Sequence, residues 1–118
     1  MGFMKLEDLP NLEIARGIKA RVVTAECVTV AHVTIEEGAL LLEHAHYHEQ
    51  VVNVIEGELE LVVKGENYVL APGNVMVLEP NVVHSGRAIT KCRVVDVFHP
   101  VRRDFAGKSF RGYPSEQK

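Results

Sequence analysis

Three histidines are crowded into the stretch EHAHYHEQ, residues 43–50. Neutral imidazole is a common ligand of transition-metal ions in proteins. Residues two apart on a β-strand point to the same face, so His44 and His46 can present two ligands side by side, and Gln50 has the same parity. One strand cannot surround an ion, and His84, at the end of a later strand-like run, is the natural further ligand. The spacing indicates a metal site, against the alternative of exposed or structural histidines.

The segments around this cluster have the composition of short β-strands. Residues 21–38 are rich in Val and Thr, residues 51–73 contain two strand-like runs, and residues 74–84 and 91–100 add further short ones. Glycine and proline separate these runs, and no helical period is apparent. This pattern predicts an all-β sandwich or barrel.

Length and composition favour one globular domain, residues 1–118. The chain has 118 residues, 47% of them hydrophobic and 25% charged, with a net charge of −3. That balance gives no reason to expect nucleic acid or a membrane surface as a partner. The start of the chain does not resemble a signal peptide, and the two cysteines lie far apart in strand-like runs. We therefore expect reduced, partly buried cysteines and a cytoplasmic protein.

The histidines belong to a longer pattern. Gly38, His44, His46, Gln50 and Gly57 follow the spacing G-x5-H-x-H-x3-E-x6-G, with glutamine in place of the glutamate. This is the first motif of the cupins, which the sequence resembles.

A second cupin motif, G-x5-P-x-G-x2-H-x3-N, aligns in part. Gly73 and His84 match it, whereas Glu79, Asn81 and Ala88 depart from it. The resemblance implies a small antiparallel β-barrel of jelly-roll type at about residues 16–105, with a lead-in at 1–15 and a tail at 106–118.

In cupins the matching positions hold one divalent metal ion inside the barrel. The resemblance therefore implies that His44, His46, Gln50 and His84 are metal ligands, and it leaves the metal open among Zn, Ni, Mn and Fe. A neutral Gln50 leaves the charge of the ion uncompensated, which suits a small anionic substrate. The alternative for Gln50 is a hydrogen bond to a ligand or to water.

The segment DVFHPVRRDF, residues 96–105, resembles the closing strand of the KdgF-type pectin-degradation cupins. Those enzymes convert 4,5-unsaturated galacturonate to its linear 5-keto form. The resemblance implies catalytic roles for Asp96 and Arg102 and substrate binding by Arg102, Phe98 and His48. Asp96 lies between apolar residues, so we expect it to face inward with a raised pKa unless a metal or Arg102 offsets the effect of burial.

Other interpretations of these residues remain open. Asp96 and Arg102 can form an ordinary ion pair at the barrel mouth, and Phe98 can be plain core. The chain can also be another metal-dependent cupin enzyme (a dioxygenase, decarboxylase, isomerase or lyase) or a non-catalytic small-molecule sensor. We expect a homodimer, because the first 25 residues carry many apolar side chains: Phe3, Met4, Leu6, Leu9, Leu12 and Ile14.

Overall fold

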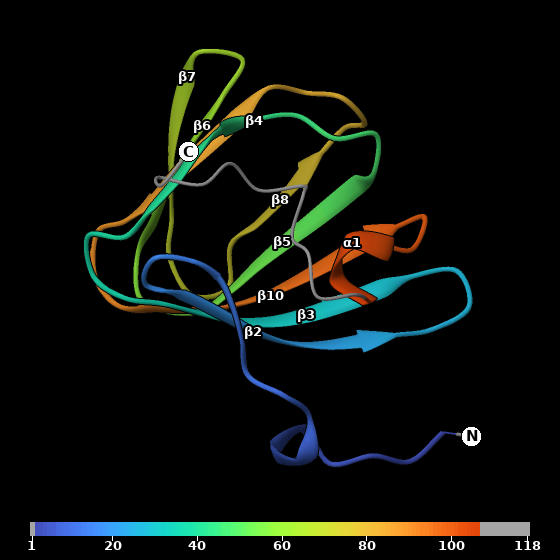
Figure 1. Cartoon of the computed structure of the whole chain (residues 1–118). Coiled ribbons are helices and arrows are strands. Elements are labelled where there is room, and N and C mark those ends of the chain that lie inside the picture. Colours follow the sequence, from blue (N-terminus) through green and yellow to red (C-terminus); the bar gives the residue numbers. More distant parts are fainter. Residues whose placement is uncertain (1, 107–118) are drawn as a thin grey trace.

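The described part of the chain, residues 2–106 of a computed structural model, is built almost entirely from β-strands (Figure 1). In chain order the elements are the 3₁₀ helix η1 (Leu6–Asp8), β1 (Leu12–Ala15), β2 (Ile18–Thr24), β3 (Thr29–Ile35), β4 (Leu40–His44), β5 (Glu49–Glu56), β6 (Leu59–Val63), β7 (Glu66–Leu70), β8 (Val75–Leu78), β9 (His84–Ala88), β10 (Cys92–His99) and the single-turn α1 (Arg103–Ala106). The predicted all-β class is confirmed.

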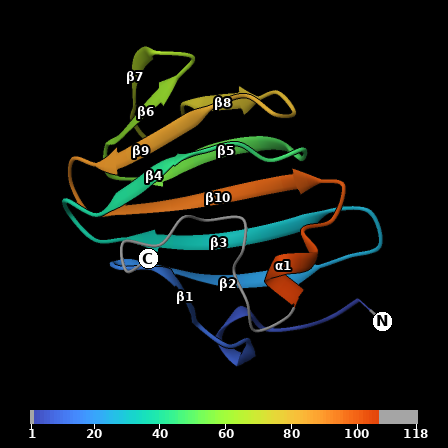
Figure 2. The same ribbon diagram turned by 45° about the horizontal axis from the view of Figure 1, so that its top comes forward.

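The strands form two antiparallel sheets that face each other (Figures 1 and 2). One sheet has six strands in the order β1-β2-β3-β10-β5-β8, and the other has four in the order β4-β9-β6-β7. The link between β4 and β5 therefore crosses from the smaller sheet to the larger one. That crossing places the predicted metal ligands on both sides of the interior.

The alternation of side chains along β10 explains how polar groups reach the interior. Every second residue from Cys92 to Phe98 is buried, and Asp96 is one of them. Strand residues point alternately to the two faces, so Asp96 shares its face with core residues. The hydrophobic core between the sheets is mostly aliphatic, with Phe98 as its aromatic member.

Gly57 allows the tight turn that ends β5. Its φ is +86°, and a Cβ built there would lie 2.1 Å from the carbonyl oxygen of Lys91. Only glycine fits such a position, because any side chain would both strain the backbone and meet that carbonyl.

β1 lies inside the predicted lead-in, where one or two short strands were expected, and it pairs with β2. Ile14, one of the apolar residues expected to support a dimer surface, is instead buried in the core of its own chain. The predicted tail at 106–118 lies outside the described residues, apart from Ala106. Both cysteines are free as expected, but Cys27 is exposed, and only Cys92 is buried. No helix within residues 2–106 is long and apolar enough to span a membrane.

Candidate metal centre

The predicted histidine ligands come from two strands and a loop of the barrel. His44 ends β4 and lies opposite His84, the first residue of β9. His46 follows β4 in the loop that crosses to β5, so the prediction that His44 and His46 share one strand face was wrong. The loop is held in place because Asn81 donates its backbone N–H to the His46 carbonyl at 2.7 Å.

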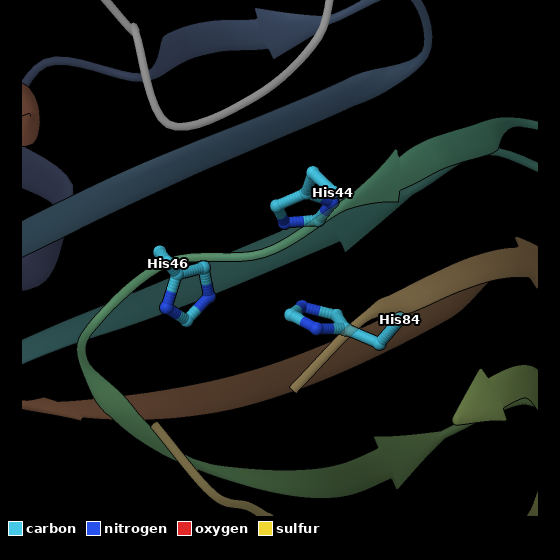
Figure 3. A group of neighbouring side chains, drawn as sticks. All are labelled: His44, His46 and His84. Atoms are coloured by element: carbon cyan, nitrogen blue, oxygen red, sulfur yellow. The ribbon is translucent and has the colours of Figure 1, made fainter. Parts of the chain in front are cut away.

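The three imidazole rings converge on one space between the sheets (Figure 3). The ring centroids are 4.3 Å apart for His44 and His84, 5.1 Å for His46 and His84, and 5.6 Å for His44 and His46. One ligand nitrogen from each ring lies within 4.8 Å of the others. The fold therefore brings His84 next to His44 and His46, although His84 lies far from both in the sequence.

Backbone carbonyls determine which nitrogen of each ring carries the proton. A carbonyl oxygen can only accept a hydrogen bond, so the Nδ1 atom facing it must donate, and Nε2 of the neutral ring keeps its lone pair. Such an anchor is typical of histidines that bind metals. The pairs are His44 Nδ1 with Leu42 O at 2.8 Å, His46 Nδ1 with His48 O at 3.2 Å, and His84 Nδ1 with Val82 O at 2.9 Å.

The environment keeps these rings neutral. Burial, as the largest cause, lowers the pKa of His44 to about 4 and that of His46 to about 4, and it lowers the pKa of His84 as well. The positive charge of Arg102 acts in the same direction on all three. A neutral imidazole is the form that binds a metal, so the rings are ready to do so at neutral pH.

Gln50 lies on the facing strand β5 and is buried. Its side-chain oxygen is 3.2 Å from Nε2 of His46. With the His46 proton on Nδ1, both atoms direct lone pairs at each other, an arrangement that a shared cation would stabilise. Ligand atoms on a tetrahedral zinc ion are ~3.4 Å apart, which is close to this separation.

These observations test whether a divalent ion fits the site. Nε2 of His84 is buried and has no hydrogen-bond partner among the described residues, a costly state unless a ligand satisfies it. Three neutral imidazoles and an amide oxygen suit Zn²⁺, Ni²⁺, Mn²⁺ or Fe²⁺. The donor set fits a divalent metal ion.

The buried carboxyl group of Asp96 lies next to this donor set. Burial raises the pKa of Asp96 to about 7, although a hydrogen bond from Gln50 and the charge of Arg102 oppose the rise. A cavity that continues into the aliphatic interior is lined by Asp96 together with Gln50 and His84. Asp96 is therefore inward-facing, as the sequence predicted.

Arg102 is fully buried just beyond β10. Its Cζ atom lies 4.9 Å from the centroid of the Phe98 ring, and its backbone N–H donates to Thr29 Oγ1 at 2.8 Å. Its ion-pair partner is Asp104, through Nε to Oδ1 at 3.1 Å and Nη2 to Oδ2 at 2.5 Å. The ion pair considered from sequence, between Arg102 and Asp96, is not the one found.

Asp104 is the residue that the sequence reasoning missed. It belongs to the same DVFHPVRRDF segment, two positions after Arg102, and only α1 turns its carboxylate back onto the guanidinium. The sequence signal that could have indicated this ion pair was an acidic residue two positions after Arg102, in the run Arg-Arg-Asp.

His48 and Tyr47, the other two ring-bearing residues of the stretch 43–50, differ in their burial. His48 is buried, its ring 6.4 Å from that of Phe98, and burial with the charge of Arg102 lowers its pKa. Tyr47 is exposed and stacks on His48, with ring centroids 4.1 Å apart. The structure therefore places His48 on the same side of the interior as Phe98 and Arg102.

A protein-family model described as the cupin domain matches residues 31–98. The chain belongs to the cupin family, and its two facing antiparallel sheets are the jelly-roll barrel that the resemblance implied.

Individual relatives extend the resemblance to the pectin-degradation cupins, which is confirmed. The pectin degradation protein KdgF of Dickeya dadantii (strain 3937) is 29% identical over 102 residues, or 84% of this chain and 93% of that protein. The structure of KdgF from Halomonas sp. has a TM-score of 0.83 and 25% identity, covering 89% of this chain and 98% of that one. An RmlC-like cupin from Shewanella frigidimarina NCIMB 400 has a TM-score of 0.83 and 30% identity, covering 89% and 96%.

Proposed function

We propose that this cupin is a metal-dependent enzyme that converts 4,5-unsaturated uronate sugars to their linear 5-keto form. The observation that carries the proposal is the gathering of a histidine cluster, a buried acid and a buried guanidinium in one interior. Similarity to the two KdgF proteins supports the sugar-acid substrate. The proposed metal ligands are His44, His46, Gln50 and His84.

The reaction is an isomerisation and needs no oxidant. A proton leaves the anomeric hydroxyl, the bond between C1 and the ring oxygen breaks to give an aldehyde, and the enol ketonises as C4 gains a proton. Asp96 is the proposed proton carrier, because a carboxyl group with a pKa of about 7 can both accept and donate near neutral pH. A bound metal ion would supply Lewis acidity toward the substrate oxygens.

Arg102 is the proposed partner of the substrate carboxylate. Its guanidinium is held by Asp104 and by the face of Phe98, so its direction is set before the substrate arrives. Phe98 and His48 would line the substrate position as apolar and polar walls, respectively. The same contacts make Asp104 a positioning residue for Arg102.

The direct test follows the ultraviolet absorbance of freshly lyase-generated unsaturated galacturonate. Metal-loaded protein should accelerate its decay, and Asp96→Ala at saturating metal should lose that acceleration by a factor of about 10² to 10⁴. Glu49→Gln, which removes an exposed carboxylate next to Gln50, is the control and should decay the substrate at the wild-type rate. A wild-type rate equal to the spontaneous decay would reject this substrate.

Oxygen uptake separates the alternatives. A cupin dioxygenase consumes O₂ with its substrate, whereas the proposed isomerisation does not. A ligand sensor would bind the uronate without changing its absorbance.

We also propose that residues 1–118 form a single cytoplasmic cupin domain that assembles as a homodimer. Phe3 and Met4 are 80% and 47% exposed, and Ile55, Val75 and Val77 expose apolar surface on β5 and β8. Size-exclusion chromatography with light scattering should give twice the monomer mass. A monomer at micromolar concentration would contradict this assembly.

A further inference from the structure

Gln50 lies between the histidine cluster and Asp96. In the register of β5 and β10, Gln50 is opposite Phe98, and Val52 is opposite Asp96. Gln50 and Asp96 are therefore diagonal neighbours on the inward face of two adjacent strands, within reach of a long side chain. Both are buried.

The two ends of the Gln50 amide have different neighbours. The NH₂ group is the only donor of this side chain, and its interaction with the Asp96 carboxyl group lowers the pKa of Asp96 against the larger effect of burial. The amide oxygen then lies on the other side, 3.2 Å from Nε2 of His46. An amide has almost the same shape in either orientation, so a neighbour that accepts a hydrogen bond from the NH₂ group decides which end faces the cluster.

We propose that Asp96 is a positioning residue for Gln50, holding its amide so that the oxygen and not the nitrogen faces the metal position. The inference rests on the metal site of the proposed function and adds a role for Asp96 that does not involve the substrate.

The same geometry explains why a glutamine suits position 50 in this chain. A carboxylate there would face the buried carboxylate of Asp96, and two like charges in one buried site disfavour each other. Gln50 donates a hydrogen bond to Asp96 and offers an oxygen to the cluster, so the two residues form a complementary pair.

The test measures affinity for Co²⁺ by competition with a chelator, together with the ligand-field absorption of the bound ion. Asp96→Asn keeps an oxygen that can accept from Gln50 and should weaken binding about tenfold. Asp96→Leu removes the acceptor and should weaken it about 100-fold with a changed cobalt spectrum. Glu49→Gln removes one carboxylate from the exposed face of β5 and is the matched control, expected within about twofold of wild type.

A second pair of variants separates positioning from simple loss of charge. A carboxylate has two equivalent oxygens and needs no neighbour to orient it. In the Gln50→Glu background, Asp96→Asn should therefore cost less than about twofold in Co²⁺ affinity, against about tenfold in the Gln50 background. Equal costs in the two backgrounds would overturn the proposal, as would Asp96 variants with wild-type affinity and spectrum.

The measurement also separates this inference from the proposed function. If the wild-type protein binds no divalent ion, the metal site and the positioning role fail together. If it binds cobalt and the Asp96 variants bind it equally well, only the positioning role fails. The cobalt data stand whether or not the uronate is a substrate.

Discussion

Replacing His84 with alanine should lower the affinity of the protein for divalent metal ions by a factor on the order of 100 to 1000. Four-ligand zinc sites bind with roughly 10–16 kcal/mol, so one ligand accounts for about 3 kcal/mol. His84 is the most buried of the three clustered histidines, and its Nε2 has no other partner among the described residues. The measurement is a chelator-competition titration with Zn²⁺ and Ni²⁺.

Two further variants make this result interpretable. His46→Ala changes a half-buried residue in a loop, so it should reduce affinity similarly with less effect on folding. His32→Ala removes an imidazole from the outward-facing side of β3 and should leave affinity unchanged. Wild-type affinity in His84→Ala, with a folded circular dichroism spectrum, would show that the cluster does not bind the ion.

The affinity of this site for a metal ion should depend on pH in a characteristic way. A histidine with an ordinary pKa of 6.5 begins to lose a bound metal to protons as the pH falls below that value. His44 and His46 have pKa values lowered to about 4, so protonation of these rings should leave the apparent metal affinity nearly unchanged from pH 7 to about pH 5. Within that range only protonation of Asp96, whose pKa is about 7, should weaken the affinity, and by no more than the loss expected for Asp96→Asn. It should fall steeply only near pH 4, where the rings become imidazolium ions. A steep fall centred on pH 6.5 would contradict the neutral cluster.

Replacing Arg102 with methionine should lower kcat/KM for the unsaturated uronate by a factor on the order of 30 to 1000. A charge-assisted contact to a buried carboxylate is worth roughly 2–4 kcal/mol, and each 1.4 kcal/mol is tenfold. Arg102→Lys keeps the charge without the planar fork and should recover only part of the loss. Initial rates at saturating metal give the comparison.

The control must account for the buried ion pair. Arg102→Met leaves Asp104 without its guanidinium, which costs about 3–5 kcal/mol of stability. The double variant Arg102→Met/Asp104→Asn removes both charges, so it should regain stability while its activity stays low. Arg103→Met, at the exposed neighbouring arginine, should keep wild-type activity. Recovery of activity with stability in the double variant would mean that Arg102 acts only through folding.

Local patterns in the sequence were sufficient for the fold class, and they named most of the residues that the structure gathers around the candidate site. Alternation of apolar and polar residues requires extended strands with one buried face, and it turned Asp96 and Phe98 inward for the same reason. The spacing of His44, His46, Gln50 and His84 named residues that the structure brings close together. His84 was proposed because one strand cannot surround an ion, and the family resemblance implied the same residue.

Tertiary structure alone decided how these residues meet. His44 and His46 do not share one strand face as predicted, because the chain leaves β4 at His44 and crosses to the other sheet. The two rings meet because of the path of that loop. The β5–β10 register set Gln50 diagonal to Asp96, and α1 brought Asp104 to Arg102. Strand register and the path of a loop depend on contacts between distant segments, and a linear pattern of side chains contains no direct record of them.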